Sequence, residues 1–262
     1  MLIWRVTQFE NLQDDPLAAG APGQGWFPRT HWSVVLAAGQ HSSPAAQAAL
    51  EQLCQAYWYP LYAFVRRRGY SPEDAQDLTQ SFFERLLERN LLADLMPSGA
   101  RFRSFLLQAL KNHLASEWIR AHAGKRGGTQ SILSLEELGA EARYKQEPAD
   151  AATPETVFER RWASTLLQQA LHKLREEQVA AGKKALFEAL ASCLTGAEPA
   201  QPYARLATQL GMSEAAVKMT IHRLRRRYGE FLRLEVAQTV IVPAEVDQEL
   251  RHLLSVLAAK ST

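Results

Sequence analysis

The segment YARLATQLGMSEAAVKMTIHRLRRRYGEFL, residues 203–232, carries the clearest structural pattern in the chain. Its first part is a short helix whose apolar side is formed by Leu206, Ala207 and Leu210. Gly211 then permits a left-handed backbone turn, and Ser213 is suited to cap the N-terminus of the next helix. The pattern therefore predicts two short helices joined by a tight turn.

The second of these helices has an apolar face and a basic face. The apolar stripe, which we expect to be buried, consists of Val217, Ile221, Leu224, Tyr228 and Phe231. The other face carries Ala215, Lys218, Met219, His222, Arg223, Arg225 and Arg226. A helix-turn-helix needs such a helix to enter the major groove of DNA. Lys218, His222 and Arg223 are suited to base edges, and Arg225 and Arg226 to phosphates. The alternative is a helical hairpin with a solvated arginine cluster.

Helical periodicity extends over most of the remaining chain. One helix ends at Gly69, a second starts after a Ser71 cap, and a third runs from Phe102 to about Ala121. The later helical stretches are 157–194, 203–210, 214–231 and 243–257. Almost no stretch alternates with a period of two, so the predicted fold class is all-α.

The composition along the chain predicts two helical domains and three other segments. Residues 130–160 hold seven acidic and three basic residues, and the stretch around them is rich in turn formers. We expect a poorly packed acidic linker there, which can lie over a basic surface. The predicted boundaries are 1–25 for a flexible arm, 26–126 and 155–232 for the helical domains, 127–154 for the linker, and 233–262 for a C-terminal extension.

The C-terminal extension contains an amphipathic helix. Its apolar stripe consists of Val246, Leu250, Leu253, Leu254 and Leu257. A soluble monomer covers such a stripe, so we expect it to pack on the preceding helical domain. The alternative is that this helix regulates that domain.

Two neighbouring N-terminal helices carry opposite charge. On the helix after Ser71, one face is formed by Asp74, Asp77, Ser81, Glu84 and Glu88, which suits a basic partner. The following helix, RFRSFLLQALKNHLASEWIR (residues 101–120), interleaves aromatic and basic residues, which suits unpaired bases and phosphates. The alternatives are a solvated acidic face and aromatic residues that belong to the core.

Taken together, these segments resemble a bacterial RNA polymerase sigma factor of the sigma-70 family, of the small extracytoplasmic-function (ECF) type. AYWYPLYAFVRRRGYSPEDAQDLTQSFFERLLE (residues 56–88) resembles regions 2.1–2.2, and residues 101–120 resemble regions 2.3–2.4. Residues 203–228 resemble region 4.2. The resemblance covers residues 26–232 and implies a sigma region 2-like bundle followed by a region 4-like helix-turn-helix.

The resemblance implies partners and roles for particular residues. The acidic helix is expected to bind core RNA polymerase at the β′ clamp helices, with the β flap as a further contact. The implied polymerase-binding residues are Asp74, Asp77, Ser81 and Glu84. The implied −10 DNA contacts are Arg101, Phe102, Arg103, Lys111, Asn112, Trp118 and Arg120. The implied −35 contacts are Lys218, Met219, His222, Arg223, Arg225 and Arg226.

The chain departs from the family pattern in the acidic helix. Where the family usually reads DAEDLVQE, residues 74–81 read DAQDLTQS, so two carboxylates are absent. A phosphate on Ser81 would supply about −1.5 to −2 charges there. Ser81, or alternatively Thr79 nearer the apolar face, is therefore a candidate for a Ser/Thr kinase. An anti-sigma factor is the other expected kind of regulator, and neutral drift at both positions is the alternative.

Other functional classes lack their sequence signals. No GxxxxGK[ST], GxGxxG, GxSxG or HExxH motif occurs, so we expect neither an enzyme nor a cofactor site. The two cysteines, Cys54 and Cys193, lie in no zinc-ligand spacing and are expected to be reduced thiols. Because we find neither a signal-peptide core nor a long apolar stretch, we expect a cytoplasmic protein without membrane contact. The second reading is a helix-turn-helix regulator that does not act as a sigma subunit.

Overall fold

The computed structural model describes residues 44–88, 101–123, 140–141, 143–145, 152–194, 202–240 and 243–258. Every regular element within these residues is a helix, which confirms the all-α prediction. The chain divides into two compact units, and the division falls inside one helix, between Ala163 and Ser164. We call the described residues before this point, with 237–240 and 243–245, the first unit. The second unit comprises Ser164–Val236 and residues 246–258.

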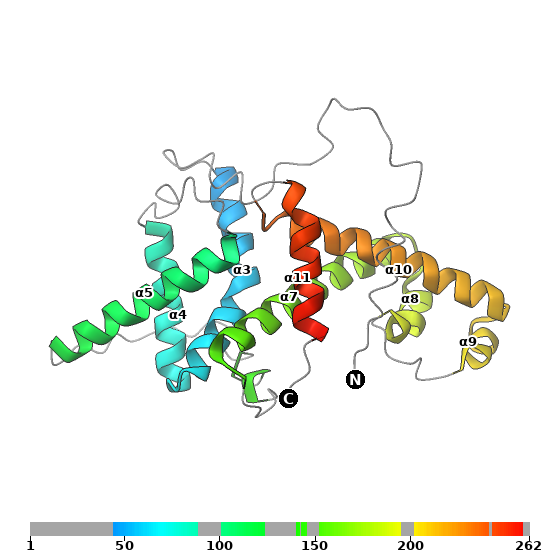
Figure 1. Cartoon of the computed structure of the whole chain (residues 1–262). Coiled ribbons are helices and arrows are strands. Elements are labelled where there is room, and N and C mark those ends of the chain that lie inside the picture. Colours follow the sequence, from blue (N-terminus) through cyan, green and yellow to red (C-terminus); the bar gives the residue numbers. More distant parts are fainter. Residues whose placement is uncertain are drawn as a thin grey trace. The chain divides into compact units, whose positions relative to one another are not determined.

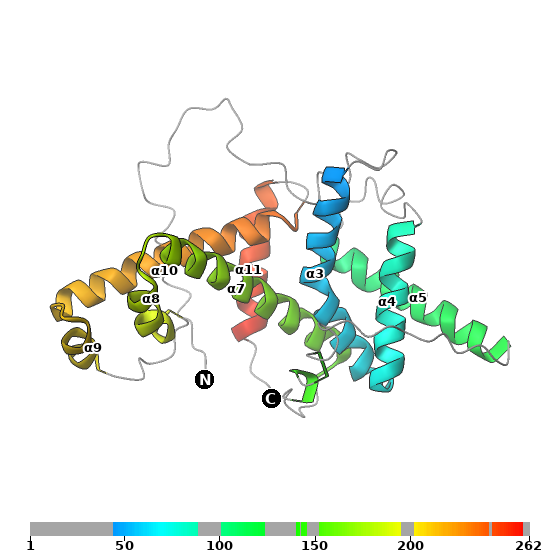
Figure 2. The same ribbon diagram turned by 180° about the vertical axis from the view of Figure 1, so that it is seen from behind.

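The first unit is built from three long helices and the start of a fourth. The helices are α3 (Pro44–Arg67), α4 (Pro72–Glu88), α5 (Phe102–Ala123) and α7 (Pro154–Ala180), of which only the N-terminal part belongs here. Figures 1 and 2 show α3 and α4 side by side, with α5 crossing α4. These bounds confirm the three N-terminal helices expected from the sequence.

The turn between α3 and α4 follows the predicted signals. Gly69 adopts a left-handed conformation, with φ of 92°, directly after α3. The Ser71 side chain then caps α4, because its Oγ accepts a hydrogen bond of 3.0 Å from the backbone N–H of Asp74. Local residue types therefore determine where α3 ends and α4 begins.

Aromatic side chains from three helices form the core of the first unit. Tyr57 of α3 is fully buried and meets Phe102 of α5 edge to face, with ring centroids 5.2 Å apart. Trp162 of α7, also fully buried, donates a hydrogen bond of 2.9 Å from Nε1 to the Tyr57 hydroxyl. The start of α7 is therefore an integral part of this unit.

The second unit contains the remaining helices. These are the rest of α7, α8 (Lys184–Leu190), the short 3-10 helix η3 (Ala191–Cys193), α9 (Tyr203–Leu210), α10 (Glu214–Ala237) and α11 (Val246–Ala258). The 3-10 helix η4 (Pro243–Glu245), which directly precedes α11, belongs to the first unit. The core side chains of α10 are Val217, Ile221, Leu224, Tyr228, Leu232 and Val236. The predicted stripe on this helix is thus buried, except that Phe231 is only half-buried.

Two features of the observed helices differ from the expectations. The helical stretch expected over 157–194 is interrupted at Gly182, which has a φ of 71° and separates α7 from α8. Helix α10 extends to Ala237 instead of Phe231. The predicted tail helix is confirmed as α11, where Val246 and Leu253 are buried.

Part of the predicted linker contacts α3. Glu141 accepts a hydrogen bond of 2.6 Å from the Tyr62 hydroxyl and forms an ion pair of 3.0 Å with Arg66. Ala140 is buried, and the Arg143 guanidinium lies 4.3 Å from the centroid of the Tyr59 ring. For these residues the expectation of poor packing is wrong. The linker residues 127–139, 142 and 146–151 and the arm at 1–25 lie outside the described residues.

Candidate functional site

One face of α4 presents an acidic surface to solvent. Asp74, Asp77 and Glu84 are exposed, as the sequence pattern predicts. Asp74 also accepts a hydrogen bond of 2.9 Å from the Ser71 hydroxyl, and Glu84 accepts one of 3.0 Å from Gln80. Both neighbours are polar and uncharged, so these carboxylates keep their charge available to a cationic partner. We call these three carboxylates the acidic face.

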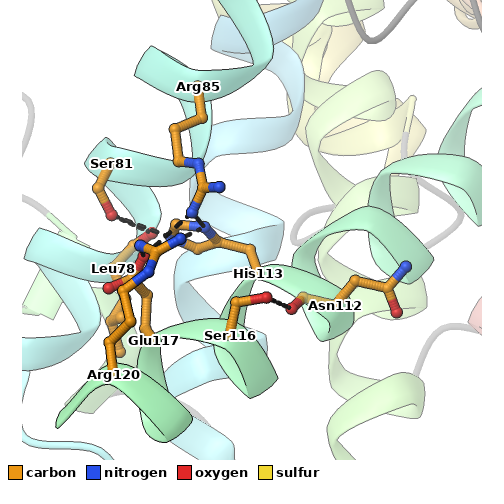
Figure 3. A network of polar contacts seen from close by, with 8 residues as sticks. All are labelled: Leu78, Ser81, Arg85, Asn112, His113, Ser116, Glu117 and Arg120. Atoms are coloured by element: carbon orange, nitrogen blue, oxygen red, sulfur yellow. Dashed lines mark hydrogen bonds and ion pairs between the residues drawn. The ribbon is translucent and has the colours of Figure 1, made fainter. Parts of the chain in front are cut away.

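The Ser81 side chain does not belong to the acidic face. Its half-buried hydroxyl lies 3.0 Å from Nε2 of His113 on α5, and it donates a hydrogen bond of 3.3 Å to the Leu78 carbonyl (Figure 3). This side chain therefore joins α4 to α5. The interpretation of Ser81 as one of a row of exposed groups is corrected accordingly.

The hydrogen bonds around His113 determine its tautomer. Arg85 Nη1 lies 3.3 Å from His113 Nδ1, and a guanidinium can only donate, so Nδ1 is an acceptor. Nε2 must then carry the ring proton of the neutral imidazole and donate it to Ser81 Oγ. Burial lowers the pKa of His113, as do the nearby Arg85 and Arg120, whereas Glu117 and the Leu78 backbone oppose this shift. The neutral form therefore matches the geometry.

Glu117 connects the same network to the C-terminal end of α5. Its carboxylate forms an ion pair of 3.1 Å with Arg85 of α4 and a second ion pair with Arg120 (Figure 3). Because one carboxylate faces two guanidinium groups, the cluster keeps a net positive charge. Arg120, a predicted DNA contact, remains mostly exposed at 57%.

Thr79, the second candidate for modification, is fully buried. Its Oγ1 donates a hydrogen bond of 2.7 Å to the Ala75 carbonyl one turn earlier. The sequence analysis places Thr79 near the apolar face, and the burial confirms that placement. A kinase could reach this hydroxyl only after α4 moved.

Two predicted DNA contacts at the start of α5 lie in the core. Phe102 is 1% exposed and packs on Tyr57. Arg103 is buried, forms an ion pair with Glu159 of α7, and has its guanidinium 5.2 Å from the centroid of the Trp162 ring. Both assignments to DNA are therefore corrected, because these side chains stabilise the packing of α5 against its neighbours.

The other predicted α5 contacts remain at the surface. Arg101 is half-buried, and Lys111 is half-buried in an ion pair of 2.8 Å with Glu155. Asn112 is exposed, and its side-chain carbonyl accepts a hydrogen bond of 3.0 Å from Gln108. The exposed residues at the end of the helix are Trp118, Ile119 and Arg120. Ile119 was not among the predicted contacts, although it is exposed beside Trp118 and Arg120.

The predicted pair of helices joined by a tight turn is present in the second unit as α9 and α10. Helix α9 ends at Gly211, which adopts the left-handed conformation with φ of 63° and ψ of 31°. Met212 N–H then donates to the Ala207 carbonyl at 3.0 Å, a bond typical of a helix C-terminus of this kind. Ser213 Oγ accepts a hydrogen bond of 3.2 Å from Ala216 N–H and so caps α10. Both predicted turn signals act as expected.

One side of α10 presents a basic surface. Its exposed members are Lys218, Met219, His222, Arg223 and Arg226. Arg226 forms an i,i+4 ion pair of 3.3 Å with Glu230, and Lys218 forms one of 2.7 Å with Glu214. Exposed pairs of this kind contribute little to stability, and a polyanion can compete for their cations. This surface has the composition that a major-groove contact requires.

Arg225 does not belong to this basic surface. Its Nε and Nη2 donate hydrogen bonds of 3.2 and 2.7 Å to the carbonyl oxygen of Cys193 at the end of η3. Cys193 itself is buried, as expected. The assignment of Arg225 to phosphate is corrected, since its guanidinium satisfies a helix C-terminus within the unit.

Two residues next to Lys218 were missed by the sequence analysis. Glu214, the first residue of α10, holds the ion pair described above, and the Lys218 ammonium lies 5.6 Å from the centroid of the Tyr203 ring of α9. The i,i+4 spacing of Glu214 and Lys218 was a signal available in the sequence. The approach of Tyr203 depends on how α9 and α10 pack.

Comparison with known proteins identifies no relative: no protein-family model, curated protein or solved structure matches the chain. Among the described residues, no helix is both long enough and apolar enough to cross a membrane.

Proposed function

We propose that the chain is a sigma factor of the ECF type, which binds core RNA polymerase and directs promoter-specific initiation of transcription. The observation that carries this proposal is the presence, on one chain, of an exposed acidic face on α4 and an exposed basic recognition helix in a helix-turn-helix. A basic clamp on the polymerase suits the first surface, and the phosphates and bases of DNA suit the second.

Within this proposal, the protein acts in the cytoplasm, and its two helical units contact different promoter elements. The α5 surface contacts the −10 element through Arg101, Lys111, Asn112, Trp118 and Arg120. The α10 surface contacts the −35 element through Lys218, Met219, His222, Arg223 and Arg226. Exposed aromatic and cationic side chains at the end of α5 suit unpaired bases and phosphates, and the capped N-terminus of α10 suits the major groove.

The direct test is transcription by purified core polymerase with the full chain, on a library of genomic promoter fragments. We expect specific transcripts only when the chain is added, and co-purification of the chain with core polymerase. Joint replacement Asp74→Asn and Asp77→Asn should weaken this co-purification most at low salt, and the difference from the wild type should shrink as salt is raised, because salt screens exposed charges. Glu176→Gln, an exposed acid on α7, is the matched control.

The same experiment also distinguishes the sigma-factor proposal from the alternative function. A chain that binds DNA sequence-specifically but neither co-purifies with core polymerase nor supports transcription is a helix-turn-helix regulator and not a sigma subunit. A chain that does neither contradicts both readings.

Regulation by a Ser/Thr kinase stays a prediction, with an anti-sigma factor as the other proposed regulator. Because the Ser81 hydroxyl is engaged with His113 and Leu78, its modification requires the side chain to leave α5. Ser81→Glu and Thr79→Glu, compared with the matching Ala variants in the transcription assay, test this mechanism. Full activity of the wild type with no gain of polymerase affinity in either Glu variant contradicts it.

A further inference from the structure

Glu214 and Lys218 stand side by side at the N-terminal end of α10, the part of a recognition helix that approaches base edges. The carboxylate and the ammonium are 2.7 Å apart, and both side chains are about half exposed, at 49% and 56%. The ammonium also lies 5.6 Å from the centroid of the Tyr203 ring, which comes from α9. An acceptor and a donor are thus presented together, and the donor is held from two helices.

This pair of groups complements the major-groove edge of a single base pair. In a G·C pair, the O6 and N7 acceptors of guanine lie next to the N4 amino donor of cytosine. An ammonium that donates to guanine and a carboxylate that accepts from cytosine can therefore bind the same pair while keeping their own contact.

An A·T pair offers a poorer match. The N6 amino group of adenine can donate to the carboxylate, but it stands between the two acceptors of this pair, adenine N7 and thymine O4. The ammonium can then reach only one of them at a time, whereas guanine presents two adjacent acceptors, O6 and N7, on the same side of the cytosine amino donor. The preferred occupant is therefore a G·C pair.

We infer that Glu214 and Lys218 together read one G·C base pair in the DNA site of α10, with Tyr203 positioning the ammonium. The inference rests on the proposed DNA-binding function and makes Glu214 a specificity-determining residue. A carboxylate near phosphates opposes binding to DNA in general, so its contribution appears as discrimination between sequences and not as affinity.

The test is selection from a duplex library with a randomised central stretch, by the full chain in the presence of core polymerase. We expect a G·C requirement at one position in the wild type. Glu214→Ala and Lys218→Ala should each relax that same position, by about tenfold, which corresponds to one good base contact. The double variant should relax it no further than either single variant, because the two groups read one pair.

Affinity for unrelated duplex should separate the two single variants. Glu214→Ala removes a negative charge and should bind it at least as tightly as the wild type, whereas Lys218→Ala should bind it more weakly. Both side chains are exposed, so the variants are expected to fold, which circular dichroism verifies. Arg226→Ala, on the same helix, is the matched control and should leave every base preference unchanged.

Three results would overturn the inference while leaving the proposed function intact. The variants could relax different positions, the shared position could be A·T, or a sequence-specific wild type could keep its preferences in both variants. A wild type that selects no sequence even with core polymerase contradicts the inference and also the proposed function.

Discussion

His113 is a buried imidazole whose surroundings favour its neutral form. From α4 it is faced by Ser81, Arg85 and the ring of Phe82, and on α5 by Glu117. Protonation would place a hydrogen on Nδ1, directly toward the Arg85 guanidinium. Burial and the two arginines therefore lower its pKa, against the attraction of Glu117.

We predict that the first unit loses stability as the pH falls below the ordinary histidine pKa near 6.5. Since the pKa of folded His113 is lowered, the unfolded chain binds more protons than the folded chain in this range, so acid favours unfolding. Urea unfolding at a series of pH values measures this slope, and His113→Gln should flatten it. His172→Gln, at an exposed position on α7, should leave it unchanged. An identical slope in His113→Gln contradicts the assignment.

Two arginines only two positions apart on α10 should have different roles. Arg223 is exposed, so Arg223→Ala should weaken selection of the −35 sequence by about 1–3 kcal/mol with little change in stability. Arg225→Ala removes two hydrogen bonds to Cys193 and should lower the free energy of unfolding by about 1–3 kcal/mol instead. DNA-binding assays and urea unfolding of both variants test whether the two arginines have these different roles. If both variants show the same pattern, the division is wrong.

At the scale of the element, α5 changes role along its length. Its first turn is internal, where Phe102 and Arg103 meet Tyr57 and Glu159, and its last turns are exposed at Trp118 and Arg120. One helix therefore joins the core of the first unit to the exposed surface that we propose as the −10 DNA contact. Assigning all aromatic and basic residues of α5 to DNA, as the sequence pattern suggests, overlooks this difference between the two ends of the helix.

This division predicts different consequences for two arginine substitutions. Arg103→Ala removes a buried guanidinium together with its ion pair to Glu159 and its contact with the Trp162 ring, and should destabilise the first unit by about 2–3 kcal/mol. Arg120→Ala should leave the free energy of unfolding within about 0.5 kcal/mol and weaken binding to −10 DNA. Urea unfolding and binding to a forked −10 duplex provide the two measurements. A stable Arg103→Ala protein that binds DNA less well would reverse the assignment.

At the scale of the whole molecule, the way in which α11 packs within the second unit indicates the role of this helix. Val246, Glu249 and Leu253 are buried, and Asp247 forms an ion pair of 2.5 Å with Arg233 of α10. Three predicted apolar positions of the stripe, Leu250, Leu254 and Leu257, are half-buried. This burial indicates that packing is the main role of α11.

We therefore predict that deletion of residues 243–262 destabilises the second unit. The deletion removes the buried side chains of Val246 and Leu253 and the partner of Arg233, so the thermal midpoint should fall. Arg233→Gln, which removes only the ion pair, is the milder comparison and should change stability by less than about 1 kcal/mol. A deletion variant that stays folded and binds DNA more tightly supports autoinhibition by α11 instead.

The sequence by itself determined the helices, their caps and most of their faces. Gly69, Ser71, Gly211 and Ser213 act where the pattern predicts, because a cap or a left-handed turn depends on residues only a few positions away. The buried stripe of α10 and the exposed acidic face of α4 were predictable for the same reason, since helical periodicity is local.

Only the tertiary structure decided which charged side chains stay at the surface. Arg103 pairs with a residue 56 positions away, Arg225 with a carbonyl 32 positions away, and Ser81 with a histidine 32 positions away. Cations and hydroxyls at these positions look the same in sequence as those that face solvent. Their partners are brought within hydrogen-bond distance by the packing of separate helices, and no local pattern records that packing.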